Sequence, residues 1–463
     1  MRYTHGPLEN YANQIEQLAT QLGLDYYPID FEIVPNNFMT EISVYGLPVR
    51  MQHWSFGIRY IHQLIRQGMG HSRIFEVMFP GDPCHAYLVN DNSVAENTLV
   101  LAHVIGHADF AKNNHLFARF MHMAGGHILE KAADRAHAIE HALSQYGQER
   151  VEAILDTALA LEPHIDVNQP IHRPTYPISE LSGATARSAG SFTERFHRLP
   201  GEAATVHMTQ ALQGTSSIPP SREYDLLWFI ANYAPELDGW ERDIFLAVRE
   251  ESFYFYPVFT CQIMNEGWAS YWHARLLREA DFLPADLYLS AIKAHSDVVR
   301  PYAADNQLSL AINPYHLGFS IWEDLIESRG IDVAREICRE EDDFGFIRNY
   351  LSAELAEKLE LFTYEADHEG SIRVSERNIH VLREAILAPK FNYGAPRVSV
   401  SQLHRDGSLE LVHDHQGDGR GLDIARAERV VDYISQIWRR PVNLQTVGAS
   451  GNLHTIVGKQ VKK

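Results

Sequence analysis

Residues 102–110 read AHVIGHADF and lie inside a helical pattern that covers residues 94–122. On a helix, His103 and His107 point the same way, with about 5–6 Å between their Cβ atoms. That separation suits two imidazoles that share one cation. Two histidines at this spacing can also satisfy hydrogen bonds inside a core, and the bare pair does not separate the two interpretations. The stretch predicts a helix with a candidate metal-binding face.

A second helical stretch, residues 264–273, reads MNEGWASYWH. Glu266 and His273 are two turns apart and therefore share one face of the predicted helix over residues 262–280. Aromatic residues flank that face, and a carboxylate buried without a partner is costly, so Glu266 should be paired or metal-bound. A buried Glu–His pair without metal is the alternative.

The composition narrows the class of protein. The chain has 463 residues and a formal net charge of −20, which argues against nucleic acids and anionic membranes as general partners. Its three cysteines show no short spacing, so we expect neither a disulfide framework nor a thiolate zinc cluster. We see no apolar signal region and no run of the roughly 20 apolar residues that a membrane span needs. We therefore expect a cytoplasmic protein.

The patterning predicts a predominantly helical α+β fold in two domains. Residues 1–360 should form a large helical domain with an N-terminal hairpin, and residues 361–463 a small α+β domain. The hairpin is expected around the turn at residues 80–83. The stretch 163–222 is rich in Pro, Ser, Gly and Thr, and we interpret it as a connection or lid.

The order of the two helical motifs is similar to that of gluzincin metallopeptidases, in which two helical histidines and a glutamate in an Asn-Glu-Gly-Phe-Ala-type helix hold zinc. The resemblance implies a gluzincin-like helical domain with His103, His107 and Glu266 as metal ligands. Gluzincins place their catalytic glutamate directly after the first histidine, whereas this chain has Val104 there. The usual general base is therefore missing.

Longer motifs resemble the SpoVR family, named for stage V sporulation protein R. They are HVIGHADFAKNNHLF at 103–117, NEGWA at 265–269, INPYHLG at 312–318, HWSFG at 53–57 and PCHAYL at 83–88. The resemblance runs from about residue 8 into the C-terminal domain. It implies a cytoplasmic protein linked to assembly of spore cortex peptidoglycan. In non-sporulating bacteria the family is associated with a PrkA-type serine kinase and a von Willebrand-like protein in stress responses. The family name assigns no reaction.

Carried over residue by residue, the resemblance supports the metal ligands His103, His107 and Glu266 and adds side chains that line the site. For the missing base, His273 and Glu96 are our catalytic candidates, since Glu96 lies eleven residues before His107 on the same stripe. The candidates for substrate contacts are Asn114, Asn265, His295 and His316. His295 could also be a fourth ligand or a helix-end hydrogen-bonding group, and His316 could cap its helix.

Three functions remain open at this point. The first is a metal-dependent hydrolase of an amide bond, in a small peptide or peptidoglycan-derived substrate, with zinc favoured over iron. The second is a non-haem iron enzyme, because two histidines and a carboxylate also form a facial triad. The third is a non-catalytic regulatory partner in the pathway of the serine kinase. No nucleic acid and no membrane span is expected in any of them.

Overall fold

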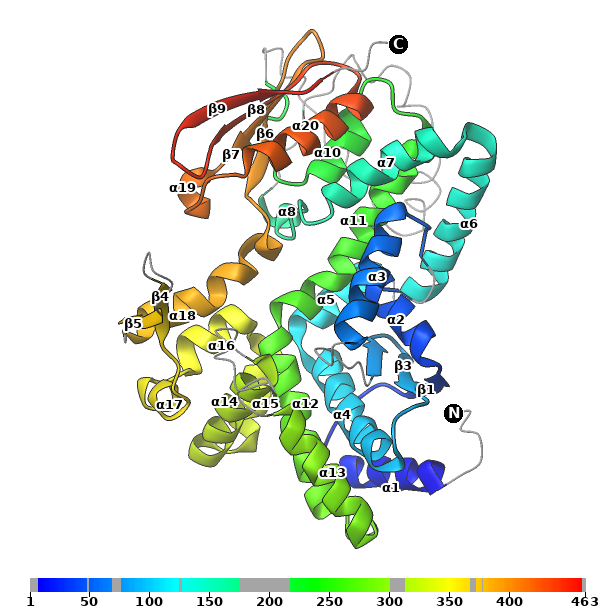
Figure 1. Cartoon of the computed structure of the whole chain (residues 1–463), viewed down its shortest axis with the longest axis vertical. Helices are drawn as coiled ribbons and strands as arrows, with labels where there is room; N and C mark the ends of the chain where they lie inside the picture. Colours follow the sequence, from blue (N-terminus) through cyan, green and yellow to red (C-terminus); the bar gives the residue numbers. More distant parts are fainter. Residues whose placement is uncertain are drawn as a thin grey trace, which may run out of the picture. The chain divides into compact units, whose positions relative to one another are not determined.

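The computed structural model describes residues 7–47, 50–68, 76–124, 127–172, 174, 176, 217–299, 313–366, 372–376 and 378–459 (Figure 1). Its contacts divide the chain into two units. Unit 1 comprises residues 1–140 and 250–394, and unit 2 comprises residues 141–249 and 395–463. No helix among the described residues has the length and the apolar character to cross a membrane.

The first half of unit 1 contains a small sheet and the helices around it. Its elements are α1 (Pro7–Gln21), β1 (Ile29–Val34), α2 (Asn36–Tyr45), α3 (Trp54–Gly68), β2 (Glu76–Phe79), β3 (Cys84–Val89), α4 (Val94–Asn113), α5 (His115–Ala124) and the first part of α6 (Ile128–Tyr146). The strands form the order β1-β3-β2, in which β1 runs parallel and β2 antiparallel to β3. The expected hairpin around residues 80–83 is confirmed.

The second half of unit 1 is almost entirely helical. Its elements are the end of α11 (Gly239–Thr260), α12 (Gln262–Glu279), α13 (Ala285–Val298), α14 (Pro314–Arg329), α15 (Ile331–Glu340), α16 (Asp343–Tyr350), α17 (Ala353–Lys358), β4 (Thr363–Ala366), β5 (Ile372–Glu376), α18 (Ile379–Leu387) and the 3-10 segment η2 (Ala388–Gly394). The strands β4 and β5 form an antiparallel pair.

Three helices, α4, α12 and α14, form the centre of unit 1. Nearly every residue of α4 is buried, as expected of a helix that is apolar on all sides. The helices approach at glycines: a Cβ atom on Gly106 would lie 2.7 Å from Cα of Ala269, and one on Gly267 would lie 2.2 Å from the carbonyl carbon of Gly318. The backbones of α12 and α14 therefore touch directly, which only glycine permits.

Polar side chains fix the ends of these helices. Ser93 and Glu96 form a capping box at the start of α4. The expected helix over 94–122 divides at Asn114, whose amide nitrogen donates to two backbone carbonyls and whose oxygen caps α5. The buried carboxylate of Asp343 accepts hydrogen bonds from two backbone amides in the first turn of α12 and also pairs with Lys390. Helix α12, which carries Glu266, therefore depends on a buried ion pair.

Unit 2 combines a four-stranded sheet with helices. Its elements are the end of α6, α7 (Gln148–Ala160), α8 (Gln169–His172), α10 (Leu226–Tyr233), the first part of α11, β6 (Val398–Leu403), β7 (Leu409–His413), α19 (His415–Asp418), α20 (Ile424–Trp438), β8 (Val442–Val447) and β9 (Leu453–Val457). The strand order is β6-β7-β8-β9, with β7 and β8 parallel and joined through α20. The expected α+β class is confirmed: the chain is mostly helical and has a small C-terminal sheet.

The expected domain boundary at residue 361 stays a prediction, and the contacts group the chain in another way. Residues 218 and 223 pair with β6 through isolated bridges, and α7 packs on α20, so the segment 141–249 belongs with the C-terminal sheet. These are long-range contacts that periodicity does not reveal. Most of the expected connection or lid at 163–222 lies outside the described residues.

Candidate metal centre

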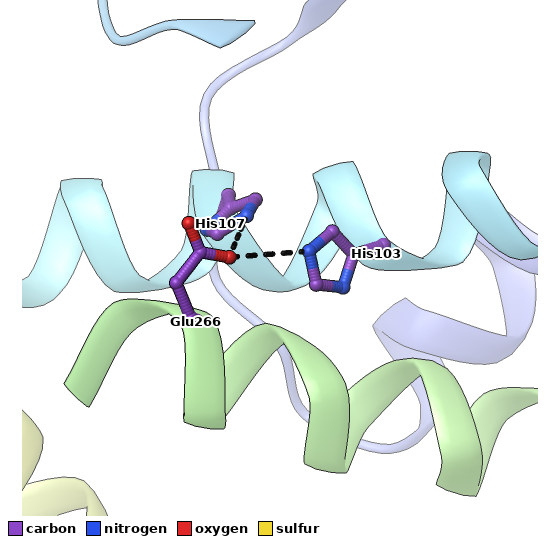
Figure 2. Close-up of side chains that lie close together, drawn as sticks. All are labelled: His103, His107 and Glu266. Atoms are coloured by element: carbon purple, nitrogen blue, oxygen red, sulfur yellow. Dashed lines mark ion pairs between the residues drawn. The ribbon is translucent and has the colours of Figure 1, made fainter. Parts of the chain in front are cut away.

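The metal ligands expected from the sequence lie together in unit 1. His103 and His107 project from α4 toward Glu266 on the neighbouring α12 (Figure 2). The Glu266 Oε2 atom is 3.6 Å from Nε2 of His103 and 3.5 Å from Nε2 of His107. Among the described residues, these three form the group whose ligand atoms could hold one metal ion. The helical spacing of the histidines thus predicted their shared face correctly.

The buried polar atoms of this cluster fit a cation. Nε2 of His103 and Oε2 of Glu266 are buried and have no hydrogen-bond partner, although a buried polar atom normally has one. Two ligand atoms about 2.1 Å from a tetrahedral zinc ion lie roughly 3.4 Å apart, close to the separations found here. A divalent cation between these groups would satisfy both buried atoms. The residues present therefore fit a transition metal.

Hydrogen bonds behind the two histidines set the direction of their rings. Nδ1 of His107 donates to Oδ1 of Asn265 at 2.8 Å, so in the neutral ring Nε2 is the unprotonated nitrogen that faces Glu266. Nδ1 of His103 lies 2.8 Å from Nδ1 of His273, whose Nε2 lies 2.5 Å from Nδ1 of His295. If Nε2 of His103 is to hold a metal, its Nδ1–H must donate to His273, and His273 must donate onward to His295. The predicted residues Asn265, His273 and His295 therefore orient the ligand rings.

Two neighbours of the site were not among the predicted residues. Glu76, on β2, places Oε1 3.9 Å from Nε2 of His103. The ring of Tyr315, at the start of α14, stacks on that of His103 with the centroids 6.0 Å apart. Tyr315 belongs to a motif that the sequence singled out, but the position of Glu76 depends on the packing of the hairpin against α4. An acidic residue in an otherwise apolar and aromatic strand was the one available signal.

Burial and mutual contacts shift the acidities of these groups. Burial raises the pKa of Glu76 to about 7, and the charge of Glu266 acts in the same direction. Burial lowers the pKa of His103 to about 4. Burial would raise the pKa of Glu266, but its close interactions with the two histidines outweigh burial and hold that pKa at about 2. Glu266 is thus a carboxylate and His103 a neutral imidazole, the forms that bind a metal. Burial would lower the pKa of His107, but its interactions with Glu266 outweigh burial and raise that pKa.

Hydrogen bonds of a buried carboxylate also contribute to the packing of α4 against α12. Asp109, two residues beyond His107 on α4, accepts a hydrogen bond from the indole nitrogen of Trp268 on α12 at 2.8 Å. Its other oxygen accepts from the backbone amide of Asp25 at 2.7 Å. Together with the close contact at Gly106, this bond fixes the register of α4 against α12. The positions of the ligands therefore follow from the helix packing.

The other predicted residues lie at some distance from the cluster. Glu96 accepts a hydrogen bond from the Ser93 amide in the capping box, two helical turns or about 10 Å before His103. Asn114 is buried and bound to backbone groups. His295 and His316 line a cavity of about 410 Å³ between α13, α14 and α17. The imidazole chain therefore leads from the ligand His103 to the wall of this cavity.

Comparisons with known proteins give a family and a relative. The family model described as "SpoVR like protein" matches residues 2–393, which include every residue of the candidate site. The chain is 26% identical to the "Uncharacterized protein YcgB" of Escherichia coli (strain K12) over 493 aligned residues, which cover 98% of this chain and 94% of that protein. No solved structure matches the chain.

Proposed function

The chain belongs to the SpoVR-like protein family, and from the site that it carries we propose that it is a metal-dependent hydrolase of amide bonds. The observation that carries the proposal is the cluster of His103, His107 and Glu266, in which two buried ligand atoms have no partner. Two histidines on one helix and a glutamate on the next give the ligand set of gluzincin zinc sites. On this basis zinc is favoured over iron.

Each side chain has a distinct part in the proposed reaction. When bound, zinc would lower the pKa of a water molecule to about 7 and polarise the amide carbonyl. Asn265 and His273 hold the ligand rings in the tautomer that keeps Nε2 free for the metal. The charge of Glu266 and burial raise the pKa of Tyr315 well above its ordinary value, so its hydroxyl stays protonated and can donate to a carbonyl oxygen.

Glu76 is our candidate for the general base that is missing after His103. It lies beside His103, whereas Glu96 is engaged in the helix cap. In gluzincins the base follows the first histidine on the same helix, and here a strand of the hairpin supplies a carboxylate. The base would take a proton from the attacking water and pass it to the leaving amine.

The resemblance to sporulation proteins guides the choice of substrate and partner. We propose an amide bond in a small peptide, and specifically in one derived from peptidoglycan, as the bond that is cleaved. A cytoplasmic protein in the pathway of a PrkA-type serine kinase would act on such peptides inside the cell. The substrate contacts predicted for His295 and His316 fit the cavity that these two residues line.

Replacement of Glu266 by alanine tests the metal site. We expect the purified protein to hold about one zinc ion per chain, and Glu266→Ala to lose it, because the site then lacks one of its three protein ligands. Elemental analysis measures the metal, and circular dichroism shows whether the variant is folded. Glu266→Gln keeps the volume and removes the charge, so it tests the ligand if the alanine variant does not fold.

Glu323→Ala is the matched control, because Glu323 is an exposed glutamate on α14 in the same unit. It should keep the full metal content. A wild-type protein that contains no transition metal and takes up neither zinc nor Fe(II) would contradict the proposal. Iron as the native metal, together with oxygen consumption, would support the second function, a non-haem iron enzyme.

Replacement of Glu76 by glutamine tests the proposed general base without changing a proposed metal ligand. We expect Glu76→Gln to keep its metal but to hydrolyse a peptidoglycan-derived peptide about 10²–10⁴-fold more slowly, which is the usual contribution of a general base. Glu96→Gln is the matched control, because glutamine also closes a capping box. If Glu96→Gln loses the activity and Glu76→Gln keeps it, the assignment of the base is wrong.

A specific feature favours the iron enzyme as the second candidate. Val104, at the position of the gluzincin base, has no ionisable group, so the helix itself offers no acid or base directly after His103. A facial triad of two histidines and one carboxylate needs no such group, because its open positions bind oxygen and substrate. Loss of all oxygen consumption after metal exchange to zinc would identify this chemistry.

A further inference from the structure

Helix α3 carries an apolar face that is exposed. Its large apolar side chains Trp54, Ile58, Ile61 and Ile65 follow the spacing i, i+4, i+7 and i+11, so they form one stripe along the helix. With the adjacent Leu64, each of these side chains is between 44% and 59% exposed. No other described element exposes more than two large apolar side chains. The stripe is therefore a concentrated feature of the surface.

The apolar stripe lies on the side of α3 opposite to the side that packs on α2. Phe56 is buried, and Tyr60 and Gln63, one and two turns later, are half-buried. At 100° per residue these three positions lie roughly opposite the apolar stripe. The ring of Phe56 contacts that of Tyr45 on α2, the helix on which α3 packs. Core packing thus explains one side of α3, and it leaves the apolar side exposed.

The charge around the stripe points to the nature of what covers it. About one residue in eight of the chain is acidic, yet the sequence of α3 contains Arg59, His62 and Arg66 and no acidic residue. Arg50, before the helix, pairs with the buried Glu251. Arg59 and His62 are exposed, and they lie between the apolar stripe and the side of α3 that packs on α2. An acidic chain thus presents a basic and apolar helix at one place. A second copy of the same helix supplies no negative charge to complement it.

We propose that α3 is a docking helix for the surface of an anionic lipid membrane. An amphipathic helix with isoleucine, leucine and tryptophan on one face and arginine beside it lies in the headgroup layer with its apolar face inserted. The stripe is convex, because it stands on a single helix, and a lipid layer needs no preformed groove to accept it. The remaining, acidic surface would be repelled, so only this face approaches the membrane.

Co-sedimentation with lipid vesicles tests this docking. We expect the full-length protein to sediment with vesicles of phosphatidylcholine and phosphatidylglycerol. It should sediment much less with phosphatidylcholine alone, and less at high salt, which screens the charge of Arg59. The double variant Ile58→Ser/Ile61→Ser should bind about tenfold less or weaker still, because it removes the centre of the apolar stripe. Arg59→Glu should weaken binding only to the anionic vesicles.

Leu289→Ser is the matched control, since Leu289 is an exposed apolar residue on α13, in the same unit but away from the stripe. It should bind vesicles like the wild type. The proposal is overturned if the wild-type protein stays in the supernatant with anionic vesicles. It is also overturned if the α3 variant only breaks a dimer in sedimentation velocity, or if Leu289→Ser reduces binding equally. The metal content does not enter the readout, so the test is independent of the proposed hydrolase.

Discussion

Gly267→Ala is expected to destabilise unit 1 by about 3 kcal/mol or more, at the upper end of what overpacking costs. The new Cβ atom would lie 2.2 Å from the carbonyl carbon of Gly318 on α14. Because the obstacle is backbone, no rotamer change relieves the contact, and the two helices must separate. The neighbouring Glu266 would move with α12, so the variant should also lose metal affinity. Denaturant unfolding and elemental analysis of the same sample measure the two effects.

A glycine without a close contact provides the control for this prediction. Gly57, within α3, has no atom within 4 Å of the position of a Cβ atom. Gly57→Ala should therefore stabilise the protein slightly, by roughly 0.5–1 kcal/mol, because alanine is the better helix former. Equal unfolding midpoints for Gly267→Ala and the wild type would mean that α12 and α14 do not pack backbone to backbone.

Asp343→Ala is expected to cost about 3–5 kcal/mol, as the removal of one partner of a buried ion pair does. The carboxylate is fully buried, accepts from the amides of Ile263 and Met264 at 2.9 Å each, and lies 3.0 Å from Nζ of Lys390. Its removal leaves a buried ammonium group without its counter-charge and two amides at the start of α12 without an acceptor. Chemical unfolding of the variant measures the loss.

Two further variants show whether the loss of stability comes from the buried ion pair or from the removal of any carboxylate. Asp332→Ala removes a carboxylate that is 93% exposed and lies 3.5 Å from Arg335, so it should change the stability by less than about 0.5 kcal/mol. Asp343→Ala combined with Lys390→Met removes the isolated charge and should recover part of the loss. A loss below about 1 kcal/mol for Asp343→Ala alone would show that water or another group replaces the carboxylate.

The sequence predicted the ligand helices because their signals are local. The spacing of His103 and His107 gives their shared face, and the aromatic setting of Glu266 indicates its burial. The hairpin of β2 and β3 was likewise predicted from its turn residues. Each of these features depends on residues within a few turns of one another, where periodicity and turn chemistry are informative.

The features that the sequence did not reveal depend on distant contacts. Glu76 reaches the site because β2 packs near α4, and no spacing in the sequence indicates this. The segment that ends the connection at residue 222 joins the sheet of unit 2 through pairing with β6, a contact that no spacing in the sequence indicates. Strand β9 was not predicted, since two of its side chains are apolar and exposed and mask the alternation.

The crossing of α4 and α12 would make a metal ion bound at the proposed site a reporter of complete folding. A hydrogen bond between the two helices joins residues 158 positions apart, His107 and Asn265, so the unfolded chain does not hold the proposed ligands near one another. A cation that binds only the folded form raises the midpoint of thermal unfolding with its concentration, as mass action requires. Closure of so long a loop is also slow, so refolding should reach helical content before it regains the capacity to retain a metal ion.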